Sequence, residues 1–214
     1  MTYKPLTGKK IAVLVESEYI PHEIECYRKR FSELGATVHL MSILWGNPSA
    51  TFINDIDPLG NDKTIYNLMV NIDFQKVDVN DYDAVLMAAN YCSVRLRYFQ
   101  PPTGSPIKPE QVKTAPAVQF FAEAMANKSI VKGSLCHGLW ILTPTDCLKG
   151  RKVICHEVVL ADILNAGAIY QPSDTKVVVD DDLVTGYSAH EVELYVDTIA
   201  AKIVKKKANC QPLF

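Results

Sequence analysis

Residues 133–140, with the sequence GSLCHGLW, place a cysteine and a histidine where an apolar run gives way to a new helix. A residue in such a strand-to-helix turn is often strained and exposed, as in the nucleophile elbows of hydrolases. The partial positive charge of a helix N-terminus favours a thiolate and lowers the pKa of a cysteine from about 8.5. We therefore predict that Cys136 is an activated thiol. A buried structural cysteine at a tight turn is the alternative that the pattern leaves open.

The residues next to Cys136 could complete a catalytic site. His137 could act as a base beside the thiol, its backbone N–H could face an oxyanion, and Gly138 permits close approach of the backbone. A second histidine, His190, opens the last helix at the carboxyl edge of the expected sheet. It could be an alternative base or a surface helix cap. No spacing of His and Cys demands a metal site, and we expect none.

Short apolar runs alternate with amphipathic stretches along the chain. The expected strands cover residues 10–15, 36–42, 83–89, 130–135 and 151–156, and residues 177–186 are typical of a hairpin. The expected helices cover residues 22–34, 114–127, 157–167 and 190–204, with Thr114 as the N-cap of the second. This alternation predicts an α/β fold with a mostly parallel sheet covered on both faces. In such folds, functional groups collect beyond the carboxyl ends of the strands.

Two segments interrupt this alternation. Residues 45–76 contain turn residues and then a strand-like run, and residues 98–113 carry four prolines, which exclude a regular helix. Long loops inside a compact domain are commonly functional lids or interface elements, and we expect the second one to help cover the pocket around Cys136. Because the sequence shows no repeat or linker, we treat residues 1–214 as one domain that carries two insertions.

The composition argues against several classes of protein. The 214 residues are 48% hydrophobic and 21% charged, with a formal net charge of −2, which disfavours disorder and a nucleic-acid partner. No apolar run is long enough to cross a membrane and the N-terminus does not look like a signal peptide, so we expect a soluble cytoplasmic protein. The six cysteines, Cys210 among them, form no C-x-x-C pair and are expected to be reduced thiols.

Several strings of the sequence resemble the ThiJ/PfpI superfamily. They are KGSLCHG at 132–138, LKGRKV at 148–153, NAGA at 165–168 and VVVDDDLVTG at 177–186, and residues 66–90 resemble the hairpin and strand that lead to the active-site loop. The resemblance runs from about residue 9 to residue 204. It implies a flavodoxin-like three-layer α/β sandwich, a homodimer, and an elbow cysteine that is the nucleophile or an oxidation-sensitive thiol. Cys136 takes that position, and His137 takes that of the adjacent histidine.

The sequence departs from the superfamily's pattern at the first helix. Members usually place a glutamate at its start, in contact with the cysteine, but counting back from Gly35 without gaps puts Ile20 there. Glu16 and Glu18 lie just before this position and could substitute for it, or they could be solvated loop carboxylates. We predict Glu16 as the partner of Cys136, because it directly follows the first strand.

A second departure follows the strand at residues 83–89. The superfamily typically has Pro-Gly-Gly in this loop, whose backbone helps to form the oxyanion site, whereas this chain has Ala88, Ala89 and Asn90. We predict that Asn90 offers its N–H or its side chain to an oxyanion. The peptidase-like branch has a glutamate a few residues further on. Val94 stands there instead, so the triad of that branch is not expected.

Three functions remain open. The first is a cofactor-independent enzyme of the glyoxalase III type, in which Cys136 attacks a small reactive carbonyl and His137 or Glu16 moves the proton. This hypothesis implies a small-molecule substrate and a role in stress response. The second is an amide hydrolase or amidotransferase, because class I glutamine amidotransferases have a catalytic His-x-Glu where His190 stands. The third is a non-enzymatic stress protein whose Cys136 thiol senses oxidation.

Overall fold

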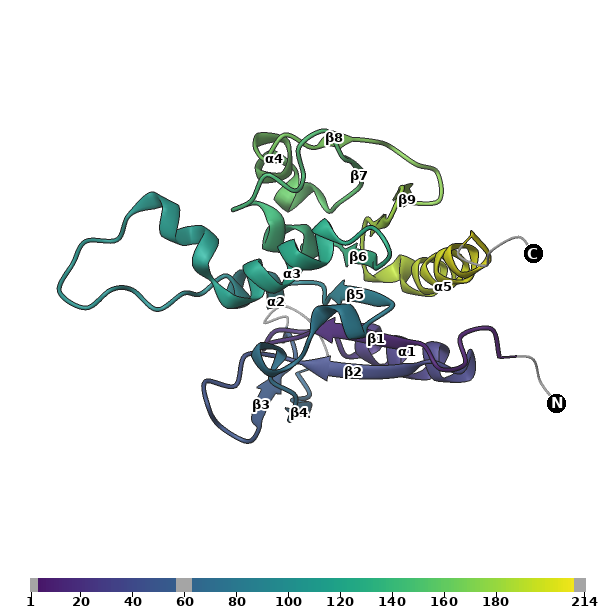
Figure 1. The fold of residues 1–214 in the computed structure, drawn as a ribbon, viewed down its shortest axis with the longest axis horizontal. Coiled ribbons are helices and arrows are strands. Elements are labelled where there is room, and N and C mark those ends of the chain that lie inside the picture. Colours follow the sequence, from purple (N-terminus) through teal and green to yellow (C-terminus); the bar gives the residue numbers. More distant parts are fainter. Residues whose placement is uncertain (1–3, 57–62, 210–214) are drawn as a thin grey trace.

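The computed structural model describes residues 4–56 and 63–209, with side chains up to Lys206, so Cys210 lies outside the described residues. Six strands form the central sheet: β1 (Lys10–Leu14), β2 (Thr37–Met41), β5 (Ala84–Met87), β6 (Val131–Leu135), β9 (Val177–Asp180) and β10 (Leu183–Gly186). Their order is β2-β1-β5-β6-β10-β9 (Figure 1). All neighbouring strands are parallel except β9, which pairs antiparallel with β10. The mostly parallel α/β sheet that the sequence predicts is confirmed.

Helices cover both faces of this sheet. They are α1 (Pro21–Glu33), α2 (Cys92–Leu96), α3 (Pro116–Ala126), α4 (Glu157–Asn165) and α5 (Val192–Asn209). The chain moves from β1 to β2 in one direction along the sheet and from β5 to β6 in the other. Because crossovers between parallel strands are right-handed, α1 and α3 lie on opposite faces, which gives the flavodoxin-like three-layer sandwich (Figure 1). The reversal between β1 and β5 is the point where open α/β sheets bind ligands.

The sequence of α1 explains where this helix starts and which side it buries. Pro21 occupies its first turn, where a missing N–H costs nothing, and Gly35 follows its C-cap with a φ of 95°. The buried positions recur every three or four residues and are Glu23, Ile24, Cys26, Tyr27 and Phe31. A carboxylate in this otherwise apolar stripe requires specific hydrogen-bond partners.

Among the described residues, no helix is both long and apolar enough to cross a membrane.

Two local expectations were wrong. Thr114 does not cap α3, because Pro116 starts that helix and holds the preceding Ala115 in an extended conformation at the N-cap. Residues 151–156 contribute only the short strand β7 (Lys152–Val153), which pairs with β8 (Ile169–Tyr170) outside the central sheet. The strand ends there because the next residue, Ile154, donates its N–H to the hydroxyl of Thr185.

Neither insertion contributes a strand to the central sheet. Within residues 45–76, β3 (Ala50–Ile53) and β4 (Asn67–Val70) form a separate antiparallel hairpin, which the short 3-10 helices η1 (Phe74–Lys76) and η2 (Val79–Asp81) follow. Residues 98–113 extend away from the body of the molecule (Figure 1) and lead into the 3-10 helix η3 (Pro109–Thr114). Two further 3-10 helices follow β6 and β10, namely η4 (Gly138–Leu142) and η5 (Ala189–Glu191).

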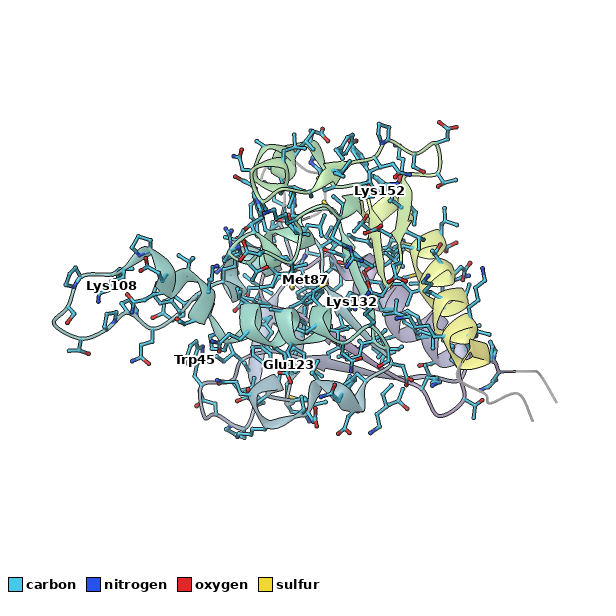
Figure 2. The ribbon with its side chains drawn as sticks, turned by 45° about the horizontal axis from the view of Figure 1, so that its top comes forward. Trp45, Met87, Lys108, Glu123, Lys132 and Lys152 are labelled. Atoms are coloured by element: carbon cyan, nitrogen blue, oxygen red, sulfur yellow. The ribbon has the colours of Figure 1, made fainter. Side chains whose placement is uncertain are left out.

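A buried ion cluster supports the strand that leads to Cys136. Lys132, in β6, is fully buried in the interior of the molecule (Figure 2), and its ammonium is paired with Asp182. Arg151 donates to the other oxygen of Asp182 at 2.7 Å and to Asp180 at 2.5 Å. Because an unpaired buried charge is strongly destabilising, these four residues hold β6 and the β9–β10 hairpin in register.

Candidate active site

Cys136 lies at the turn that leaves the end of β6. Its φ is 55°, in the left-handed region that residues other than glycine rarely adopt, so the backbone is strained there. Its N–H donates to the carbonyl of Gly186 at 2.9 Å, and its own carbonyl accepts from the N–H of His156 at 3.5 Å. The strained elbow that the sequence predicts is therefore present. The expected exposure of Cys136 was wrong, because only 7% of the residue is accessible to solvent.

Two backbone N–H groups and one imidazole face the Cys136 sulfur. The N–H groups of His137 and Asn90 act on the thiol and favour its charged form by lowering its pKa. Asn90 has a φ of 59°, and its side-chain amide donates to the carbonyl of Glu18 at 3.0 Å, so its backbone rather than its side chain serves the sulfur. Nδ1 of His137 lies 3.5 Å from Sγ. The fold thus brings Cys136, His137 and Asn90 together.

The carboxylate that acts on Cys136 is Glu23, in the first turn of α1. Its side chain is fully buried, and its charge raises the pKa of the Cys136 thiol. The N–H of Ala89 donates to both of its oxygens, at 3.0 Å and 2.9 Å, and the hydroxyl of Tyr27 donates to Oε1 at 2.6 Å. The glutamate expected at the start of the first helix is therefore present. Ungapped counting placed it three residues too early, at Ile20.

Glu16 and Glu18 face an arginine rather than the elbow. Glu16 accepts the N–H of Ser17 at 2.5 Å and lies 3.7 Å from Nε of Arg95. Glu18 pairs with the same guanidinium at 2.9 Å. Cys136 feels the charges of Glu23 and Glu157, and neither Glu16 nor Glu18 is among its perturbing groups. We therefore replace Glu16 by Glu23 as the carboxyl partner, although Glu16 is the residue that directly follows β1.

Burial governs the protonation of all three central groups. It raises the pKa of the Cys136 thiol from 9.0 to about 12, lowers the pKa of the His137 imidazole from 6.5 to about 4, and raises the pKa of the Glu23 carboxyl from 4.5 to about 7. The resting site near neutral pH therefore holds a thiol and an uncharged imidazole. The low thiol pKa expected from a helix N-terminus was wrong, because η4 is a 3-10 helix of five residues and desolvation outweighs its dipole.

The second histidine of the site is His156 and not His190. The centroids of the His137 and His156 rings are 5.1 Å apart, and the ring of Tyr187 stacks on His156 at 5.5 Å. Nδ1 of His156 accepts the N–H of Val158, which leaves the proton of a neutral ring on Nε2. His190 is exposed on η5, where its N–H donates to the hydroxyl of Ser188. His190 is therefore a surface residue of η5 whose helix cap is Ser188, and no contact in the described part of the chain supports a pairing of His190 with Cys136.

The part of the chain that contains the elbow is similar to a known protein family. Residues 103–202 match the model of the DJ-1/PfpI family. The protein named cysteine protease YraA, from Bacillus subtilis (strain 168), is 26% identical over 188 residues, which are 88% of this chain and 94% of that protein. Deglycase PH1704 of Pyrococcus horikoshii is 26% identical over 176 residues, which are 82% of this chain and 88% of that protein.

Solved structures share the whole fold. The crystal structure of the ThiJ/PfpI domain protein from Brachyspira murdochii gives a TM-score of 0.69 over 93% of this chain and 98% of that chain, at 15% identity. The chain belongs to the DJ-1/PfpI superfamily. The superfamily placement that the sequence motifs predict is confirmed, and the names of the two relatives fit a cysteine-based enzyme.

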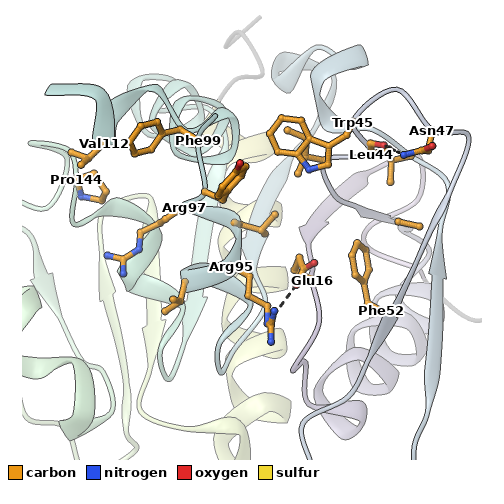
Figure 3. Close-up of a pocket in the computed structure, with 15 residues that line it drawn as sticks. Glu16, Leu44, Trp45, Asn47, Phe52, Arg95, Arg97, Phe99, Val112 and Pro144 are labelled. Carbon is orange, nitrogen blue, oxygen red and sulfur yellow. Dashed lines mark hydrogen bonds and ion pairs between the residues drawn. The ribbon is translucent and has the colours of Figure 1, made fainter. Parts of the chain in front are cut away.

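The two insertions of this DJ-1/PfpI protein build a cavity beside the elbow. The cavity has a volume of ≈ 850 Å³ and lies at the carboxyl edge of β1 and β2 (Figure 3). Trp45 and Phe52 line it from the first insertion, and Phe99 and Val112 line it from the second (Figure 3). Cys136 does not line it. The loop at residues 98–113 therefore walls this neighbouring cavity instead of covering the thiol.

The absence of a side chain at Gly138 allows close packing at the DJ-1/PfpI site. A Cβ at this position would lie 2.5 Å from Oγ of Ser134 and 3.2 Å from the carbonyl oxygen of Met87, so only glycine lets η4 pack this closely on β5 and β6. The structure assigns Gly138 this packing contact, and the N–H groups that face the sulfur belong to His137 and Asn90. Within the described residues, no group of three His, Cys, Asp or Glu side chains is placed to hold a metal ion.

Sequence signals existed for the two site residues that the sequence analysis missed. Glu23 precedes Tyr27 by four residues on the apolar face of a predicted helix, which is the spacing of side chains that touch within one helix face. His156 stands at the N-cap of α4, three residues after the end of β7, and its N–H donates to the carbonyl of Cys136 at the elbow. His156 and His190 share the pattern of a histidine at the start of a helix that follows a strand, and only the tertiary fold distinguishes them.

Proposed function

We propose that this chain is a cofactor-independent enzyme that converts small 2-oxoaldehydes to 2-hydroxy acids, as glyoxalase III enzymes do. The observation that carries the proposal is a fully buried carboxyl, Glu23, whose pKa is about 7 and whose charge acts on the Cys136 thiol. A general acid–base works best when its pKa lies near the working pH. Glu23 could therefore both accept and return a proton at neutral pH, which this isomerisation requires.

The reaction begins with addition of the thiol to the aldehyde. Glu23, in its carboxylate form, takes the Cys136 proton as the sulfur bonds to the aldehyde carbon, and then passes it to the new alkoxide, which gives a hemithioacetal and restores the carboxylate. Glu23 next moves the proton from the former aldehyde carbon to the neighbouring carbon, while the hemithioacetal hydroxyl proton passes to the former ketone oxygen, which gives the thioester of a 2-hydroxy acid. Water hydrolyses this thioester, so the net change is addition of one water to the 2-oxoaldehyde and release of the 2-hydroxy acid.

The other groups of the site stabilise charge in these steps. The N–H groups of His137 and Asn90 act on the sulfur and would favour negative charge on the sulfur, or on the oxygen of the carbon bonded to it. His156 could donate from Nε2 to the second carbonyl oxygen as a proton reaches its carbon. The buried elbow limits access of bulk water, which keeps the thiol from being ionised until substrate is present.

Product analysis with a single substrate class tests this proposal. The wild-type protein should form lactate from methylglyoxal without any added cofactor, and Cys136→Ala and Glu23→Gln should each abolish this formation. Glu16→Gln and His190→Ala are matched controls that should retain it, because neither residue contacts the thiol. Absence of lactate with the folded wild-type protein, or lactate formation at the wild-type rate by Cys136→Ala, would reject the proposal.

A second candidate is peptide-bond hydrolysis by a Cys136–His137 pair, which the 3.5 Å distance from Sγ to Nδ1 favours. This candidate lacks an orienting group, because Nε2 of His137 is buried without a hydrogen-bond partner among the described residues. Release of amine from fluorogenic peptide amides by the wild type, and its loss in His137→Ala, would favour hydrolysis.

We also propose that the protein is a homodimer that acts in the cytoplasm during carbonyl stress, and light scattering would test the dimer.

A further inference from the structure

We propose that two buried tyrosines, Tyr27 of α1 and Tyr195 of α5, are positioning residues that fix the proton of Glu23 on Oε2, the oxygen left for chemistry at Cys136. The inference deepens the proposed function and rests on it for its catalytic meaning. Neither tyrosine contacts the sulfur: Tyr27 donates to Glu23, and Tyr195 acts on Tyr27. They therefore act through the carboxyl group and not on substrate.

Tyr27 fills one side of the Glu23 carboxyl group. It lies one helical turn after Glu23, is fully buried, and donates its hydroxyl to Oε1 at 2.6 Å. The N–H of Ala89 lies 3.0 Å from Oε1 and 2.9 Å from Oε2. Oε1 thus accepts from two donors, whereas Oε2 shares only the N–H of Ala89. Because a carboxyl oxygen that accepts two hydrogen bonds is the poorer site for a proton, the proton of neutral Glu23 is placed on Oε2.

Tyr195 fixes the direction in which Tyr27 donates. Its hydroxyl is fully buried, and no hydrogen-bond partner lies within normal distance among the described residues. The ring centroids of Tyr195 and Tyr27 are 6.2 Å apart, and each hydroxyl affects the ionisation of the other. A buried hydroxyl that lacks a partner is costly, so a small rotation that lets Tyr195 donate to Tyr27 is favoured. Tyr27 must then direct its own proton to Glu23.

The strand that carries the elbow has space for this pair. A Cβ on Gly133, in β6, would lie 2.2 Å from the hydroxyl oxygen of Tyr195. The absence of a side chain at Gly133 therefore lets the Tyr195 hydroxyl reach the sheet three residues before Cys136. With the Tyr195 hydroxyl rotated toward Tyr27, a row of hydroxyls from α5 through α1 would end at the Glu23 carboxyl group, and hydrogen bonds in such a row strengthen one another.

Within the described part of the chain, no cationic side chain faces Glu23 from the elements that pack around it. The groups that face it are Tyr27 and Cys26 from α1, Tyr195 from α5, Cys92 from α2, Cys136 from the elbow, and the N–H of Ala89 from the loop after β5. The Tyr27 hydroxyl and the Ala89 N–H are the donors that favour the charged carboxylate. Removal of the Tyr27 hydroxyl should therefore raise the pKa of Glu23, and removal of the Tyr195 hydroxyl should do so to a smaller extent.

The test is a titration of Glu23 in the free protein. Glutamate labelled with ¹³C at the carboxyl carbon gives one NMR signal per residue, and the signal missing from Glu23→Gln identifies Glu23. In Tyr27→Phe its titration midpoint should rise by about 1 pH unit or more, and in Tyr195→Phe by less, because a hydrogen bond to a charged group is worth at least that shift. Phe31→Leu is the matched control, since Phe31 is buried on the same helix face and carries no hydroxyl.

Measurements of turnover distinguish a failure of this inference from a failure of the proposed function. If the wild type is active, the pH profile of kcat/KM in Tyr27→Phe should move to higher pH in parallel with the titration, and the rate should recover at high pH. A titration shift in a protein that never forms lactate would uphold the positioning of Glu23 and reject the proposed activity. An unchanged Glu23 midpoint in both tyrosine variants would overturn the inference, whatever the activity. If Tyr27→Phe fails to fold, the sign of the shift in Tyr195→Phe decides.

Discussion

Replacement of Glu23 by glutamine should inactivate the protein and stabilise its fold at the same time. Glutamine has nearly the shape of glutamate and keeps an oxygen that can accept from the Ala89 N–H and the Tyr27 hydroxyl, but it cannot take the proton of Cys136. A positioned acid–base group contributes about 10²- to 10⁴-fold to a rate, so kcat/KM for methylglyoxal should fall by about that factor.

The expected gain in stability follows from the pKa of Glu23, which burial raises from 4.5 to about 7. Between these values the folded protein binds one more proton than the unfolded chain, so the free energy of unfolding falls as the pH rises. This contribution is fully present below pH 4.5 and is lost as the pH rises through about 7. At about 1.36 kcal/mol per unit, the loss amounts to about 3 kcal/mol. Glutamine does not titrate, so the variant should be more stable than the wild type above neutral pH.

Urea unfolding at about pH 5 and about pH 8, read together with lactate formation, checks both effects. The stability of the variant relative to the wild type should rise by about 2 to 3 kcal/mol between the two pH values. Glu16→Gln is the matched control, because it removes a half-buried carboxylate of the neighbouring loop and should leave activity within about tenfold. Equal pH dependence in wild type and Glu23→Gln, or retention of activity in that variant, would refute the reasoning.

Three further predictions concern the thiol and the scaffold. Iodoacetamide should label Cys136 slowly at neutral pH, with a rate that still increases above about pH 9, because burial raises the thiol pKa to about 12; a plateau near neutral pH would contradict this. Asp182→Ala should lower the free energy of unfolding by about 3–5 kcal/mol, since it leaves Lys132 charged and buried, whereas Asp197→Ala at an exposed pair should cost under about 1 kcal/mol. Gly138→Ala should cost about 1–3 kcal/mol in the same urea experiment, because its Cβ would lie 2.5 Å from Oγ of Ser134.

The layers of the fold were predictable because each central strand is a short apolar run that is buried on both faces. β1, β5 and β6 have almost no exposed side chain, so their sequences lack the alternation of half-exposed strands. The short strand β7 was mispredicted because two residues carry too little pattern to reveal their partner. Its pairing with β8 depends on residues that are distant in sequence.

The carboxyl partner of Cys136 could not be identified by position in the sequence alone. Glu16 and Glu18 follow β1 directly, but Arg95 of α2 draws both of them away from the elbow. Glu23 lies within an apolar helix face, where a charged residue is unexpected unless hydrogen bonds satisfy it, and its donors come from Ala89 and from its own helix. That pairing exists only after α1 packs on the sheet, so it belongs to the tertiary structure.

The protonation of the thiol is the other property that the sequence did not contain. A strand-to-helix turn predicts both strain and a helix dipole, and the strain is present at Cys136. The dipole is weak because η4 is short, and the desolvation that dominates the thiol pKa depends on how the folded chain packs around the sulfur. Burial of this kind is a consequence of packing, and local sequence patterns do not report it.

The central claim is that Cys136 forms a covalent intermediate whose proton transfer depends on Glu23. Rapid acid quenching of the wild-type protein during turnover of methylglyoxal, followed by peptide mass spectrometry, tests it most directly. The account predicts an adduct of one methylglyoxal on the peptide that contains Cys136, which is absent from Cys136→Ala and forms far more slowly in Glu23→Gln. Lactate formation by the wild type with no adduct at Cys136 under any quench time would contradict it.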